Sequence, residues 1–167
     1  MKAKRHAELE AGRQNEAWFS ERLIEAALAD EIRLITSSIA LVECISAGEA
    51  FPEPIADETK QLFSDFLWSG KYVELISFDP FVAERARDLR WIDNVKIKNN
   101  DAIHVATALL EGAQEFLTVD EKLKTRFAPL DGEMRGAGMS AIVPSNTGLL
   151  SEERRSADMF EPGKAPA

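Results

Sequence analysis

Two aspartates, each at the junction of two predicted elements, are the residues of this chain best suited to chemistry. Asp101 opens the segment DAIHVATALL, whose apolar spacing predicts a helix that ends at Gly112. The apolar run 116–119 then predicts a buried strand, and Asp120 follows it directly. In parallel α/β folds, ligands gather at the edge where the strands end. Carboxylates without basic neighbours at such an edge usually need a cation, so this pair predicts a site for a hard metal ion.

Glu43 is the third acidic residue of this kind. It lies in the apolar helical run 39–45, after a predicted strand and a pair of serines. A carboxylate in such a run is costly to bury unless it meets a cation or a hydrogen-bond donor. If its helix begins at the same sheet edge, then Glu43, Asp101 and Asp120 converge from three separate connections. Oxygen ligands of this type suit Mg²⁺ or Mn²⁺, ions that activate water and neutralise phosphate during phosphodiester hydrolysis.

Each of these residues also has a simpler interpretation. Asp101 is favoured in the first turn of a helix by the helix dipole, Asp120 is suited to cap the next turn, and Glu43 could lie on the solvent side of its helix. His104 follows Asp101 by three residues and shares its helix face. A zinc site would need more His or Cys than this chain has, so packing beside the site or bonding a backbone carbonyl is favoured for His104.

The elements that must position these side chains alternate between helix and strand. Helices are predicted near 14–29, 39–45, 57–68, 80–91 and 101–111, and strands near 32–36, 72–77, 116–119 and 140–143. Asp79 is predicted to cap the fourth of these helices, with Pro80 in its first turn. Residues 51–54 and 124–138 are predicted to be loops. This order predicts an α/β fold with a mainly parallel sheet and right-handed crossovers.

Composition describes a soluble, single-domain protein. The chain has 167 residues, of which 45% are apolar and 29% are charged. We expect an N-terminal flank at 1–13, the domain at 14–145 and a disordered tail at 146–167. No stretch approaches the ~20 apolar residues that span a bilayer, and the N-terminus lacks the apolar region of a secretory signal. Together with the single Cys44, this predicts a cytoplasmic protein with no membrane partner.

The net charge of −9 argues against a general nucleic-acid coat protein. It does not exclude a nuclease, because a metal-dependent active site must itself be acidic.

Three motifs in order resemble the PIN domain. They are Thr-Ser-Ser followed by Leu-Val-Glu at 36–43, Asp-Ala-Ile-His at 101–104, and Phe-Leu-Thr-Val-Asp at 116–120. The likeness spans about residues 14–145 and is greatest to the VapC-type toxins of toxin–antitoxin pairs. It implies a Rossmann-like sheet, a Mg²⁺- or Mn²⁺-dependent endoribonuclease acting on RNA, a cognate antitoxin and a possible homodimer. By position, Glu43, Asp101 and Asp120 match the metal-site acids, and Thr118 matches a small hydroxyl residue that supports them.

The resemblance also exposes a missing element. The family pattern begins with a central strand of the type apolar-apolar-Asp-Thr/Ser, whereas residues 1–13 contain no β-branched residue and predict a helix extension or a frayed start. We therefore expect a PIN-like sheet without its first, central strand, a slot in the core and weakened Mg²⁺ binding. Three explanations stay open: a misassigned start codon, a gene remnant, or a catalytically inactive protein that binds an antitoxin or RNA.

Overall fold

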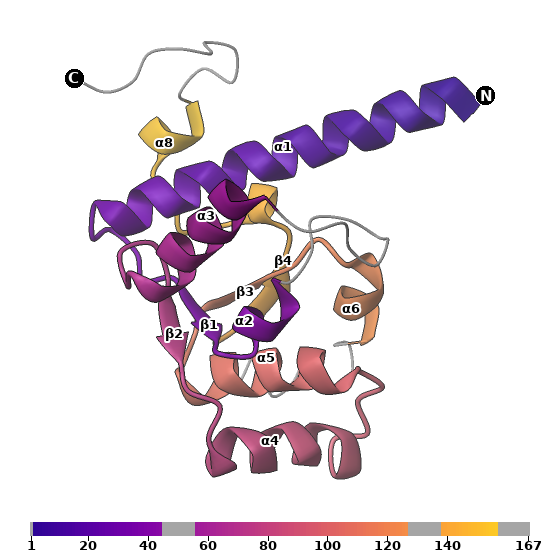
Figure 1. Cartoon of the computed structure of the whole chain (residues 1–167). Helices are drawn as coiled ribbons and strands as arrows, with labels where there is room; N and C mark the ends of the chain where they lie inside the picture. The colour runs from indigo at the N-terminus through magenta and orange to yellow at the C-terminus, as the bar shows by residue number, and fades with distance from the viewer. Residues whose placement is uncertain (1, 45–55, 127–137, 157–167) are drawn as a thin grey trace.

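Helices flank four short strands in the computed structural model, which describes residues 2–44, 56–126 and 138–156 (Figure 1). The elements are, in order, α1 (Lys2–Leu28), β1 (Ile35–Ser37), α2 (Ala40–Glu43), α3 (Asp57–Trp68), β2 (Glu74–Ile76), α4 (Pro80–Trp91), α5 (Asn99–Leu110), β3 (Glu115–Leu117), α6 (Glu121–Arg126), β4 (Ser140–Ile142), η2 (Pro144–Asn146) and α8 (Glu152–Ser156). The predicted α/β class and the predicted strands are confirmed, with boundaries shifted by at most three residues.

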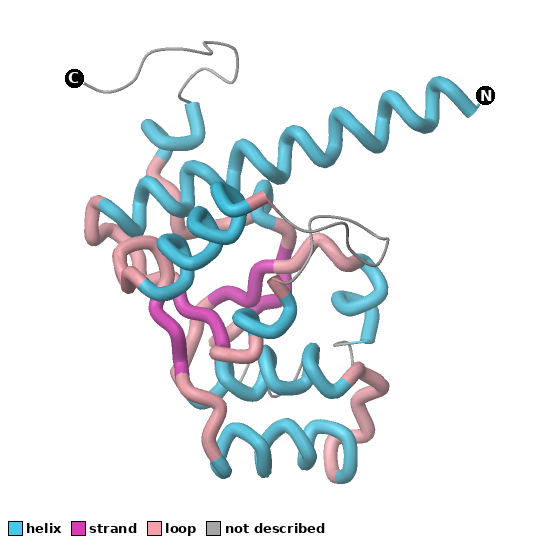
Figure 2. The backbone as a smooth tube through the Cα atoms, viewed as in Figure 1, coloured by secondary structure: helices cyan, strands magenta, loops and turns pink. Residues whose placement is uncertain are grey.

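The strands form two separate parallel pairs within the described residues. Strand β1 pairs with β2 in the register Thr36↔Leu75, and β3 pairs with β4 in the register Phe116↔Ala141. In Figure 2 the strands lie between the long helix α1 and the helices α4 and α5. Parallel pairing requires a crossover between partners, and α2 and α3 lie in the connection between β1 and β2.

Helices α4 and α5 form the largest apolar cluster. Leu89 of α4 and Val105 and Ala106 of α5 are fully buried there. Asp79 caps α4 by accepting a hydrogen bond from the Val82 N–H at 2.9 Å, and Pro80 occupies the first turn, both as predicted. This packing fixes α5, the helix whose first turn carries Asp101.

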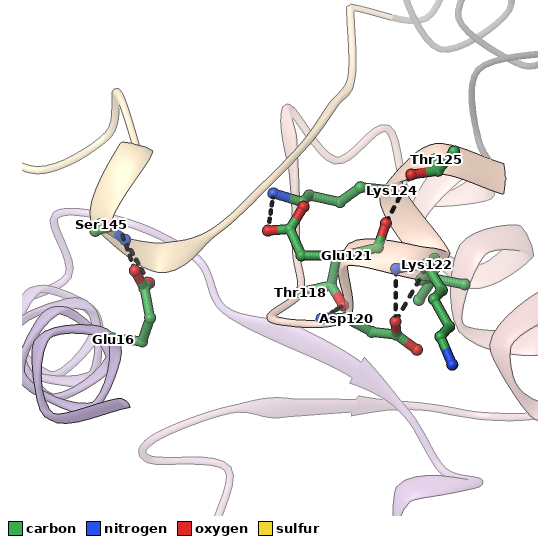
Figure 3. Close-up of polar contacts among 9 residues, drawn as sticks. Glu16, Thr118, Asp120, Glu121, Lys122, Lys124, Thr125 and Ser145 are labelled. Atoms are coloured by element: carbon green, nitrogen blue, oxygen red, sulfur yellow. Dashed lines mark hydrogen bonds and ion pairs between the residues drawn. The ribbon is translucent and has the colours of Figure 1, made fainter. Parts of the chain in front are cut away.

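Helix α1 covers the opposite side of the strands. It runs without a break from Lys2, so residues 2–13 form a helix extension, one of the two alternatives that the sequence left open. Leu23 and Ala26 pack with Leu150. The Glu16 carboxylate accepts hydrogen bonds from the backbone N–H and the hydroxyl of Ser145 (Figure 3).

Three predictions need correction. Residues 124–126 were expected in a loop but complete α6, which Asp120 caps. Residues 152–156 of the tail expected to be disordered form α8, and the Arg154 guanidinium donates two hydrogen bonds to Glu31. The apolar neighbours of Trp68 and Trp91 in the sequence favour packing in the core or in a dimer interface; the core interpretation is wrong within this chain, because the two residues are 69% and 77% exposed.

Two further points complete the comparison with the sequence. The loop predicted at 51–54 and the tail from residue 157 onward lie outside the described residues. No helix in the described ranges is long and apolar enough to cross a membrane.

Candidate active site

Glu43 lies against the N-terminal half of α5. Its Oε1 accepts a hydrogen bond from Asn100 Nδ2 at 2.9 Å, and its Oε2 lies 2.7 Å from His104 Nε2. Asn100 and His104 are four residues apart, so they share one face of α5 and hold both carboxylate oxygens. Glu43 is the last residue of the four-residue helix α2, and this contact ties the end of α2 to α5.

The surroundings of Glu43 favour its charged form. Partial burial alone would raise the pKa of the carboxyl. The hydrogen bonds from His104 and Asn100 together outweigh this effect, so the net pKa lies below the ordinary value. Glu43 is therefore a carboxylate at neutral pH, held in one orientation by two side chains.

Asp101 lies beside this contact in sequence. It is half-buried in the first turn of α5, directly after Asn100. Among the described residues it makes no side-chain hydrogen bond or ion pair. A first-turn carboxylate is favoured by the helix dipole, so its position agrees with both the metal-ligand and the helix-stabilising interpretations.

Asp120 caps the helix that follows it. Its Oδ1 accepts hydrogen bonds from the backbone N–H groups of Lys122 at 2.8 Å and Leu123 at 3.2 Å, so it caps α6 (Figure 3). These two bonds lower the pKa of the carboxyl. The Thr118 hydroxyl accepts a hydrogen bond from the Asp120 N–H at 3.1 Å. Thr118 thus supports the backbone of the turn that carries Asp120, while its role beside a metal-site carboxylate stays a prediction. The capping interpretation of Asp120 is confirmed.

The structure therefore brings only part of the predicted set together. Glu43 meets α5 next to Asp101, whereas Asp120 and Thr118 belong to a separate turn at the end of β3. No group of three or more His, Cys, Asp or Glu side chains with metal-holding geometry exists among the described residues. The described arrangement is therefore no ready-made metal cage, and a divalent ion held by all three acids would need Asp120 to approach Glu43 and Asp101.

Sequence reasoning missed the hydrogen bonds to Glu43. His104 was expected to contact a backbone carbonyl or to pack beside the site, and it contacts the Glu43 carboxylate instead. No role was predicted for Asn100 from the sequence. The four-residue spacing between Asn100 and His104 was the available signal, because it predicts that the two side chains face one partner.

Comparison with known proteins gives one match. The PIN domain family model matches residues 8–126, which is 119 of the 167 residues. The match begins within α1 and ends with α6, so it contains all four predicted site residues. No curated protein matches the chain. No solved structure matches it. PIN domains are generally nucleases that depend on divalent metal ions and act on nucleic acid. The chain belongs to the PIN domain family.

Proposed function

We propose that this protein is a metal-dependent endoribonuclease, the toxin of a toxin–antitoxin pair. Its RNA substrate would be cut with the help of Mg²⁺ or Mn²⁺ held by Glu43, Asp101 and Asp120, and Thr118 would support Asp120. The partner would be a cognate antitoxin protein, in the cytoplasm, and a homodimer stays a prediction. The observation that carries the proposal is the contact of Glu43 with α5 beside Asp101, in a chain of a family that generally consists of nucleases.

The charge state of the acids supports this function. The pKa values of Glu43 and Asp120 both lie below their ordinary values, so both side chains are anionic at neutral pH. Anionic oxygen ligands are the kind that Mg²⁺ and Mn²⁺ prefer. His104 and Asn100 would act as positioning residues, because they fix the orientation of the Glu43 carboxylate.

One observation favours a second function. The described residues contain no group of three metal ligands, and the Asp120 carboxylate already caps α6. Mg²⁺ is reluctant to lose water and binds weakly where ligands are few or displaced. The alternative is therefore a catalytically inactive PIN-like protein that binds an antitoxin or RNA.

An RNA cleavage assay separates the two functions. The chain is incubated with RNA in Mg²⁺ and in EDTA, and Asp101→Asn is compared with the wild type. Glu58→Gln is the matched control, because Glu58 is an exposed acid in the first turn of another 12-residue helix, α3. A nuclease should lose cleavage in EDTA and in Asp101→Asn, and keep it in Glu58→Gln. Cleavage that survives EDTA or Asp101→Asn would refute the enzyme proposal as drawn.

A further inference from the structure

A large cavity separates the two strand pairs. Its volume is about 790 Å³, and its walls include the consecutive residues 32–37 leading through β1 and 114–118 leading through β3. No residue of β2 or β4 lines it. The cavity therefore lies along the edges of β1 and β3 that face away from their partners. The cavity is partly open to solvent, and its volume lies in the range of ligand-binding clefts, about 300–1,000 Å³.

The backbone along these two edges is ready to pair with another strand. In β1, the Leu34 carbonyl accepts from Glu74 and the Ser38 N–H donates to Ile76, so the even-numbered residues face β2. In β3, the Thr118 N–H donates to Ile142, which likewise points the even-numbered residues toward β4. Backbone groups alternate along a strand, so the N–H and C=O groups at 35, 37, 115 and 117 point the other way. In the described part of the chain, neither edge has a neighbouring strand.

Helices cover both faces of this cavity. Leu23 of α1 lines it on one side, and Thr107 and Ala108 of α5 line it on the other. The sequence of a strand that is covered on both faces is a nearly continuous apolar run, without alternating polar residues. The small side chain of Ala108 leaves room for branched residues such as Val or Ile. The five consecutive residues 114–118 line the cavity, so an extended apolar segment of similar length fits along this edge.

Charge sets the direction of such a segment. Three glutamates line the cavity, Glu31, Glu111 and Glu115, and all of them lie near the starts of β1 and β3. Arg33 pairs with Glu111 at 3.1 Å, which joins the starts of the two strands, and Arg154 pairs with Glu31 at 2.6 Å. Glu115 accepts hydrogen bonds from the Thr147 hydroxyl and the Gly148 N–H, and in the described residues it pairs with no cation. The uncompensated charge of Glu115 at the start of β3 favours a basic N-terminal end at this position, so the inserted segment would run in the same direction as β1 and β3.

We propose that this cavity is a docking site for an extended segment of a partner protein, which enters as a parallel strand between β1 and β3. The segment is apolar along its length and basic at its N-terminal end. Pairing of its backbone with both edges provides affinity, as in other cases of strand addition, and the cavity walls provide selectivity. The proposal does not require the chain to cut RNA.

The test uses a synthetic peptide with an N-terminal lysine, five alternating valine and isoleucine residues and a dye on a C-terminal serine. Binding to the full chain is measured by fluorescence anisotropy. A peptide of the same sequence with N-methyl groups at alternate residues keeps every side chain and loses hydrogen-bond donors on one edge. We expect it to bind about tenfold more weakly, because two or three hydrogen bonds are lost. Equal binding of the two peptides would overturn the proposal.

Amide hydrogen exchange locates the peptide on the protein. Bound peptide should slow exchange at the N–H groups of 35, 37, 115 and 117. It should leave Ser38 and Thr118 unchanged, because their N–H groups already donate to Ile76 and Ile142. Protection confined to other residues would overturn the proposal. So would protection of the same four amides that rises with protein concentration without peptide, because a second copy would then fill the cavity.

A pair of variants completes the design. Ala108→Phe places a ring in the cavity and should weaken peptide binding at least tenfold, whereas Ala17→Phe on the exposed face of α1 should leave it unchanged. If Ala108→Phe does not fold, the binding of the N-methylated peptide and the pattern of amide exchange still test the proposed docking site. Failure of peptide binding and failure of RNA cleavage are separate readouts, so the two proposals stand or fall independently.

Discussion

The contact between Glu43 and His104 should stabilise the protein by an amount that a double-mutant cycle can measure. The two side chains meet at 2.7 Å and are 38% and 21% exposed. A hydrogen bond to a charged group contributes about 1.5–3 kcal/mol when it is well buried. At this exposure water screens the pair, and we expect a coupling free energy of about 0.5–1 kcal/mol.

The assay is urea unfolding of the wild type, Glu43→Ala, His104→Ala and the double variant. The control cycle replaces Glu43→Ala by Glu58→Ala, an exposed acid on α3, and should give no coupling. The pH dependence has a definite sign. The pKa of Glu43 is lowered in the folded state, so its contribution is present above the ordinary value of about 4.3 and is lost as the pH falls through the folded-state pKa. A coupling of zero at pH 7, or one that grows below pH 4, would refute this account of the site.

Three further changes test how the fold positions the site. Leu89→Ala removes a fully buried side chain between α4 and α5, and should lower the free energy of unfolding by about 2–5 kcal/mol in urea melts. Asp79→Ala removes the cap of α4 and should cost about 1 kcal/mol, whereas Asp79→Asn keeps an acceptor and should cost less; equal losses would contradict the capping role. Gly112→Ala should raise no clash, since nothing lies within 4 Å of the added carbon. Its positive φ of 65° should still cost about 1–2 kcal/mol, measured by thermal unfolding.

Local sequence signals were sufficient for most of the elements. The cap at Asp79, the proline after it and the glycine after α5 act within a few residues, so the sequence alone predicts their effects. The same holds for Asp120, whose capping of α6 was one of two interpretations that the sequence left open. The end of β3 could not be placed to the residue, because the apolar run continues to Val119, which the structure leaves 67% exposed.

The candidate site depends on long-range placement, which the sequence does not encode locally. Convergence of Glu43, Asp101 and Asp120 was predicted on the assumption that all three lie at one edge of the sheet. The described strands form two separate pairs with a cavity between them, so β1 and β3 are not neighbours in a common ladder. Glu43 and Asp120 follow different pairs, which explains why the structure brings Glu43 to α5 and leaves Asp120 apart.

The central claim is that three carboxylates act together in RNA cleavage, and Asp120→Asn tests it most directly. Asparagine caps helices about as well as aspartate, so this variant should keep α6 and its fold while it loses the charge. In single-turnover assays with Mg²⁺, we expect the rate of RNA cleavage by Asp120→Asn to be at least about tenfold below that of the wild type. Glu43→Gln and Asp101→Asn should lower the rate to a similar extent. Unchanged cleavage by a folded Asp120→Asn would contradict the account and leave Asp120 as a helix cap alone.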